Sequence, residues 1–125
     1  HIARAAIEGI ALSVANLVEL AEKSLNSKLE ELAVDGGAAA SNLLLQAQAD
    51  STGLIIRRPS NLESTARGVA FLAGIQVGVI NDLKELVPKN KENSSLFSPN
   101  IDSKTRSKWL SKWDNAINRS LQWHD

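Results

Sequence analysis

Two adjacent glycines, Gly36 and Gly37, are the residues whose type and position could do chemistry. They follow a short apolar run and precede helix-forming residues, so the sequence predicts a turn between a strand and a helix. The backbone amides of Gly37, Ala38 and Ala39 would then face out of the helix start with a partial positive charge, which suits a phosphate. Glycine also lets a ligand approach the backbone closely. The spacing alone leaves an ordinary tight turn as the alternative.

Carboxylates and histidines offer no recognisable acid–base pair. Asp35 directly precedes the glycines, and a capping role for it is a better interpretation than a base or a magnesium ligand. His1 and His124 lie at opposite ends of the chain, which argues against an imidazole metal site or a catalytic triad. We therefore assign no catalytic residue and no metal ligand, including among the remaining carboxylates considered, Glu8, Glu30, Glu31 and Asp50.

Composition and charge lower the expectation for several classes of function. The 125 residues are 43% hydrophobic, enough for a small core, and 14 basic residues balance 14 acidic ones. Because the formal net charge is zero, no overall electrostatic field would attract the chain to nucleic acid or to an anionic membrane. The longest apolar stretches, Ile10–Leu20 and Val69–Ile80, are too short to span a bilayer. The absence of cysteine and of a secretory signal fits a cytoplasmic protein.

The first half of the chain predicts a helix, a strand and a second helix around the glycine turn. Apolar residues recur at helical spacing over Ile2–Ala21, and the polar stretch Ser24–Lys28 ends that helix. The short apolar run Leu32–Val34 is interpreted as a buried strand. Ala38–Asp50 returns to helix-forming residues.

The region after the second helix predicts another strand and another helix. Leu54–Arg57 has β-branched character and is closed by Pro59. Ser60 and Glu63 are spaced as a capping box for a helix over Ser64–Ile80. Small residues recur every four positions in this helix and indicate close packing against a neighbouring backbone; they are Ala66, Ala70, Gly74 and Gly78.

The last third predicts a connection followed by a helix. The polar run Lys89–Ser95 is interpreted as exposed, and secondary structure over residues 81–103 stays open. A helix over Lys104–Trp123 carries a stripe that includes Trp109, Trp113 and Trp123, which we expect to dock this helix rather than to stack on a ligand. Helix, strand, helix, strand, helix, loop and helix argue for an α/β fold. Two strands are too few for a protected sheet, so we expect further strands upstream of this chain.

Several segments, in this order, resemble the FGGY family of carbohydrate kinases. The resemblance covers nearly the whole chain except about residues 85–103. The opening helix, the Asp-Gly-Gly-Ala context, Arg58-Pro59 and the tryptophan-bearing tail narrow it to the members that phosphorylate glycerol. The segments that carry it are His1–Ala11, Val34–Ala38, Asn42–Leu44, Gln46–Asp50, Arg58-Pro59, Glu63–Gly74 and Trp113–Trp123.

This resemblance implies an actin-like, ribonuclease-H-like ATPase fold, in which two such domains close on ATP and magnesium. It implies that residues 1–125 are the C-terminal part of the family's C-terminal domain. The upstream sheet strands, the N-terminal kinase domain, the glycerol site, the catalytic aspartate and the magnesium ligands would then lie outside this chain. We therefore expect the chain alone to be inactive. A sheet cut in this way should leave an unpaired strand edge and exposed apolar side chains on Ile2–Ala21.

The resemblance also assigns an ATP site. In the family the second glycine of the turn contacts the nucleotide phosphates, and an asparagine four residues later helps to hold the adenosine. These positions correspond to Gly37 and to Ser41, where a serine can hydrogen-bond but reaches less far. We expect the turn to open onto a cleft, with ATP-binding residues Gly36, Gly37, Ala38, Ser41 and Asn42. Arg67 stands where the family more often has an apolar residue and is interpreted as a solvated helix charge.

Two other interpretations stay open. One is another FGGY kinase that acts on a sugar such as xylulose or gluconate. The other is a non-catalytic relative, or an interaction module in which the glycine turn binds nothing, an interpretation that Ser41 favours. The expected partners are ATP or ADP, glycerol bound by the missing upstream region, and the remainder of the same kinase. Nucleic acid and membranes are not expected, and a homo-oligomer stays open.

Overall fold

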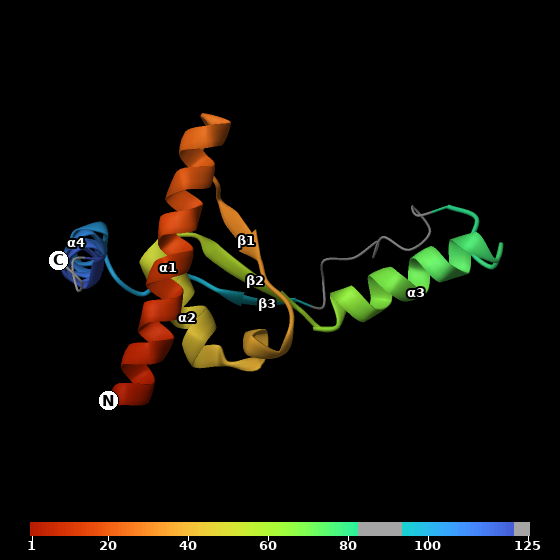
Figure 1. Ribbon diagram of the computed structural model, residues 1–125, viewed down its shortest axis with the longest axis horizontal. Coiled ribbons are helices and arrows are strands. Elements are labelled where there is room, and N and C mark those ends of the chain that lie inside the picture. Colours follow the sequence, from red (N-terminus) through yellow and green to blue (C-terminus); the bar gives the residue numbers. More distant parts are fainter. Residues whose placement is uncertain (83–93, 122–125) are drawn as a thin grey trace.

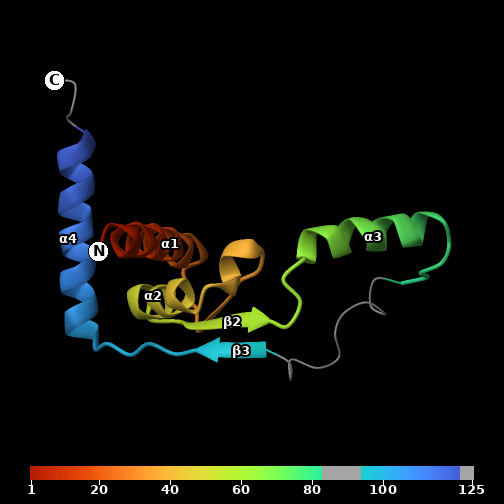
Figure 2. The same cartoon turned by 90° about the horizontal axis from the view of Figure 1, so that it is seen from below.

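The computed structural model describes residues 1–82 and 94–121 and shows helices packed on one face of a small sheet (Figures 1 and 2). The mixed helices and strands confirm the predicted α/β class. The elements in chain order are α1 (Ile2–Leu25), β1 (Glu31–Ala33), the 3-10 helix η1 (Gly37–Ala40), α2 (Asn42–Thr52), β2 (Ile55–Pro59), α3 (Ser64–Gln76), β3 (Ser94–Phe97) and α4 (Ser103–Leu121).

The sheet has the strand order β1-β2-β3. β1 runs parallel to β2, with Leu32 opposite Ile56, whereas β3 runs antiparallel to β2, with Phe97 opposite Ile56. The third strand was not predicted, because its residues Ser94–Phe97 show no strand alternation and β3 is formed only by pairing with β2. Of the predicted exposed connection, residues 89–93 lie outside the described residues, and Ser94 and Ser95 belong to β3.

The core lies between the sheet and α2, and a second cluster joins α2 to α1. Ala39, Leu45, Ala49 and Ile56 form the first cluster, with Leu32, Val34, Leu62 and Phe97 packed against it. The second cluster is small, Ala11, Leu44 and Ala47, so α1 and α2 approach each other closely. At this contact the Ser51 hydroxyl donates to the Ala11 carbonyl at 3.0 Å, which satisfies a buried polar group.

One predicted helix start and one predicted helix cap are wrong, whereas α3 begins at Ser64 as predicted. The helix expected from Ala38 is interrupted, because residues 37–40 form η1 and Ser41 then caps α2 by accepting a bond from the Leu44 amide at 3.3 Å. The capping box expected at Ser60 is absent from the described residues. Instead Glu63 is the N-cap residue of α3, and its amide donates to the Asn61 side chain at 2.8 Å.

The helix α3 has no buried residue among the described residues. It ends at Gln76, four residues before the predicted Ile80, and it extends away from the rest of the fold (Figure 2). Val69 and Leu72 are each 65% exposed. The close packing predicted for its row of small residues is therefore not found in the described part of the chain. Spacing identifies the face that can pack, but it does not identify what covers that face.

The last helix docks through its tryptophans, as predicted for Trp109 and Trp113. Trp109 packs against the Ala11–Leu44–Ala47 cluster, and the Trp113 ring lies 3.6 Å from where a Cβ on Gly9 would stand. Trp123 lies outside the described residues. At the start of the helix, Arg106 donates to the Asp50 carbonyl at 2.9 Å, which ties α4 to the end of α2.

Replacing Trp109 by alanine should loosen α4 from the fold. The half-buried ring covers a small cluster, so its loss should lower the free energy of local opening by about 2 kcal/mol. In the full-length protein, trypsin cleavage at Lys108 and Lys112 should then become roughly 30 times faster. Ser107→Ala, on the exposed side of the same helix, is the matched control. Equal cleavage of the Trp109→Ala variant and the control would contradict the docking role.

The exposed surfaces expected from a cut sheet are present. On α1, Ile2 is 90% and Leu17 is 65% exposed, while Ala11 and Ala15 on the opposite side are buried against the fold. β1 forms one edge of the sheet, with β2 as its neighbour in the described residues. Within those residues, no helix is both long and apolar enough to cross a membrane.

Candidate functional site

The glycine turn lies between β1 and η1, close to its predicted place. Gly36 has φ 82° and ψ 174°, a conformation that essentially only glycine adopts, and its amide donates to the Leu62 carbonyl at 2.9 Å. Among residues 1–82 and 94–121, and apart from its chain neighbours, nothing lies within 4 Å of the position that a Cβ on Gly37 would take. The backbone of the turn is therefore fixed at Gly36, whereas the space beside Gly37 is open.

A hollow of about 270 Å³ lies beside this turn, and its walls come from residues on either side of the two glycines and from α2, whereas Gly36 and Gly37 themselves do not line it. Of the α2 residues that line the hollow, Gln48 is the polar one. Its side chain is only 7% exposed, and its Oε1 has no hydrogen-bond partner among the described residues. Sequence reasoning did not single out Gln48, although its place one turn after Leu44 indicates the buried side of α2. The lining residues are Val34, Asp35, Ala38, Ala39, Leu44, Leu45 and Gln48.

The amides of the turn differ in part from the prediction. The Ala39 amide donates to the Gly36 carbonyl at 3.0 Å and so does not face outward. The amides of Gly37 and Ala38 make no hydrogen bond within the described residues. The difference arises because η1 forms i to i+3 bonds, which satisfy the third amide earlier than an α-helix would. Two donors therefore remain for an anion at this turn.

The polar residues around the turn have defined partners. Asp35 is exposed and does not cap the turn, because Gly36 occupies the N-cap position of η1. The Ser41 hydroxyl is used to cap α2. The Asn42 Oδ1 accepts a bond from Arg58 at 2.8 Å. Arg58 therefore reaches the site from β2, a role that sequence reasoning missed; the alternation of β2, which places Arg58 on the same face as Ile56, could have indicated it.

Two of the other carboxylates, Glu31 and Asp50, make separate structural contacts. Glu31 forms an ion pair with Arg57 across β1 and β2, and the Arg57 Nε donates to Glu31 at 2.6 Å. Asp50 accepts a bond from the Asn100 amide at 2.6 Å. Arg67 lies 5.4 Å from the centroid of the Phe71 ring on its own helix. Within residues 1–82 and 94–121, no group of three potential metal ligands converges.

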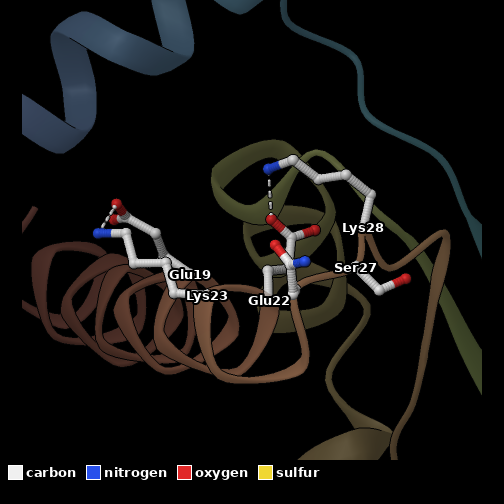
Figure 3. Close-up of a pocket in the computed structure, with 6 residues that line it drawn as sticks. Glu19, Glu22, Lys23, Ser27 and Lys28 are labelled. Carbon is white, nitrogen blue, oxygen red and sulfur yellow. Dashed lines mark hydrogen bonds and ion pairs between the residues drawn. The ribbon is translucent and has the colours of Figure 1, made fainter.

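A second hollow lies at the end of α1, and Figure 3 shows that charged side chains bridge it. Glu22 accepts bonds from Lys28 at 2.6 Å and from the Leu29 amide at 3.0 Å, and Lys23 pairs with Glu19 at 2.6 Å. The bond from Lys28, and then the bond from Leu29, hold the pKa of Glu22 below its ordinary value. These contacts fasten the connection between α1 and β1, so we interpret the hollow as structural.

Glu22 should make stability depend on pH. Because its pKa is lowered in the folded state, its contribution is present above pH 4.5, the ordinary value, and is lost as the pH falls through the lower folded pKa. Glu22→Gln should therefore lower the thermal midpoint at pH 7 more than at pH 3. Glu19→Gln is the control, because both groups of its ion pair are largely exposed. The same loss for Glu22→Gln at both pH values would contradict a charged role.

Comparison with known proteins places this geometry in a family. Residues 1–77 match the model of the FGGY family of carbohydrate kinases, C-terminal domain. The chain is 44% identical over 123 residues to a glycerol kinase of Carboxydothermus hydrogenoformans, covering 98% of this chain and 24% of that protein. The solved structure of Plasmodium falciparum glycerol kinase with ADP matches with a TM-score of 0.78 and 30% identity, over 97% of this chain and 24% of that one.

A ligand-bound xylulose kinase from Lactobacillus acidophilus has the same fold, with a TM-score of 0.69 and 24% identity over 98% of this chain and 25% of that one. These neighbours confirm the predicted actin-like ATPase fold. The chain spans about a quarter of the length of the relatives that it matches. With the model of the family's C-terminal domain matching residues 1–77, more than half of the chain, the chain belongs to the FGGY family of carbohydrate kinases.

Proposed function

We propose that this chain is part of a glycerol kinase and forms one wall of its ATP site. The observation that carries the proposal is the 44% identity to a glycerol kinase over 98% of the chain. A glycerol kinase with 30% identity has been solved with ADP, which supports a nucleotide as the ligand. Only about a quarter of the relatives' length is represented, so the whole enzyme would need residues beyond this chain.

We propose the glycine turn as the place where the phosphates bind. Gly36, Gly37 and Ala38 present open backbone, and two of their amides have no partner among the described residues. An anion would accept bonds from those amides without meeting a side chain. Ser41 and Asn42 follow directly and would lie toward the adenosine. Because the Ser41 hydroxyl also caps α2, its contact with adenosine would be weaker than that of a longer side chain.

The proposed reaction is transfer of the γ-phosphate of ATP to glycerol, which gives glycerol 3-phosphate and ADP. Catalysis of this type depends mainly on positioning and on charge stabilisation. The residues described here supply positioning of the nucleotide. The base, the glycerol site and any protein ligand of magnesium would come from the remainder of the same kinase, since this chain spans about a quarter of the relatives' length. We propose a cytoplasmic enzyme, and its oligomeric state stays open.

Activity of the full-length protein that contains this chain tests the proposal. Purified enzyme should bind ADP and should transfer phosphate from ATP to glycerol, measured as ADP release with glycerol, xylulose and gluconate offered separately. Turnover with glycerol alone is the expected result. Turnover with a sugar instead would identify another kinase of the family. Absence of ADP binding would overturn the nucleotide site.

A further inference from the structure

The side chain of Arg58 links the strand β2 to the glycine turn. Alternation along β2 places Arg58 on the same face as Ile56, the face that α2 covers. Ile56 is fully buried in the core, and Arg58 is half-buried at the end of β2 nearer the turn. Its guanidinium therefore sits where the core meets the proposed ATP site.

On the turn side, Arg58 satisfies the end of η1. Its Nη1 donates to the carbonyls of Ala39 at 3.1 Å and Ala40 at 3.4 Å, and to the Asn42 Oδ1 at 2.8 Å. The last carbonyls of a helix find no hydrogen-bond donor within the helix, and a positive charge at that end is favourable. Arg58 thus caps the C-terminal end of η1, because it supplies the donors that the four residues of this helix lack.

On the sheet side, Arg58 is held by β3. Its Nη2 lies 3.4 Å from the Ser95 hydroxyl, and the guanidinium carbon lies 5.2 Å from the centroid of the Phe97 ring. Stacking on an aromatic face and hydrogen bonding in the guanidinium plane can occur together. One planar group therefore connects η1, α2, β2 and β3.

The turn needs such support because its own structure is weak. A 3-10 helix of one turn has poor hydrogen-bond geometry, and the glycines at its start, Gly36 as the N-cap and Gly37 as the first helical residue, lose a large conformational freedom on folding. In the absence of Arg58, nucleotide binding would have to supply the free energy of ordering the turn.

We infer that Arg58 is a positioning residue for the nucleotide, which holds the turn of residues 36–40 in its binding shape without touching the ligand. This inference rests on the proposed ATP site. Lysine cannot replace it, because a single ammonium group cannot cap two carbonyls, reach Asn42 and stack on Phe97 at once. The effect should appear in the affinity for ATP and not in the affinity for glycerol.

The test uses the full-length kinase with Arg58→Lys and Arg58→Gln. Both variants should raise the KM for ATP and the Kd for ADP by about tenfold, the order expected when bonds from a charged group are lost. The KM for glycerol and the kcat should stay within about twofold. Arg57→Lys is the matched control, because Arg57 is the neighbouring residue on the opposite face of β2 and pairs with Glu31. It should leave the KM for ATP unchanged.

Added guanidinium ion should partly restore ADP binding in Arg58→Gln and should leave ADP binding of the control unchanged, a result that a general folding defect would not give. If Arg58→Gln does not fold, Arg58→Lys decides the matter, since it keeps the charge and most of the stem. An unchanged KM for ATP, or a parallel rise in both KM values with a lower thermal midpoint, would overturn the inference. If instead the unmodified kinase binds no ADP, the proposed function itself fails.

Discussion

Replacing Gly37 by valine in the full-length kinase should weaken ATP binding by on the order of a hundredfold while leaving the thermal midpoint almost unchanged. Apart from its chain neighbours, no described residue has an atom within 4 Å of the Cβ position, so the described part of the chain has room for the side chain. That room is the open side of the turn, where the phosphates are proposed to bind. A β-branched side chain would occupy it in a stiff rotamer and would keep the phosphates from the Gly37 and Ala38 amides.

Gly68→Val is the matched control for this substitution. Gly68 also has nothing within 4 Å of its Cβ position, but it lies in α3. The Kd for ADP, measured by titration calorimetry, should change for Gly37→Val alone, and glycerol binding should change for neither. Equal weakening of ADP and glycerol binding by Gly37→Val would indicate a folding defect. Unchanged ADP binding would show that the phosphates do not bind at this turn.

Residues 1–125 produced alone should not form a stable monomer. One side of α1 is apolar and exposed, α3 has no buried residue in the described part of the chain, and β1 leaves an open edge. The core of the described residues is small: it holds two clusters and a few further buried residues, and several of its members are alanines. Such a core buries too little surface to offset the conformational entropy of the chain. We expect a broad thermal transition, binding of a hydrophobic dye, and association in solution.

The full-length kinase is the control for that experiment, and it should show a sharp transition without dye binding. A charged substitution on the exposed face of α1, Leu17→Glu, tests whether this uncovered apolar face causes the association of the isolated chain. It should improve the solubility of the isolated chain and should destabilise the full-length protein, where that face is expected to be covered. A cooperative transition with a monomeric hydrodynamic size for residues 1–125 would show that the chain is an independent domain.

The helices and the glycine turn could be predicted because their signals are local. Helical spacing defined α1 and α4 to within a few residues, and Gly36 is at a backbone conformation that few other residues adopt. The tryptophan stripe indicated docking because aromatic rings at helical spacing bury a large area, and Trp109 and Trp113 do pack against the fold.

The features that were missed depend on contacts between distant segments. β3 exists through its pairing with β2, and no property of Ser94–Phe97 alone requires a strand. The break at Ser41 depends on a side-chain cap that competes with continuation of the helix. Arg58 was visible in the sequence only as part of a family segment, and its role follows from three acceptors that lie 16 to 19 positions away along the chain.

The packing of α4 against α1 has a consequence for synthesis. Because α4 is made after every other described element, Trp109 and Trp113 reach Gly9 and Ala11 only when the ribosome has nearly finished this stretch. At about 5 to 20 residues per second, α1 can pack against α2 early, but the part of its surface that α4 covers stays bare for several seconds. During that interval it is a natural binding segment for a chaperone, and a ribosome stalled before Ser103 would leave it permanently uncovered by α4.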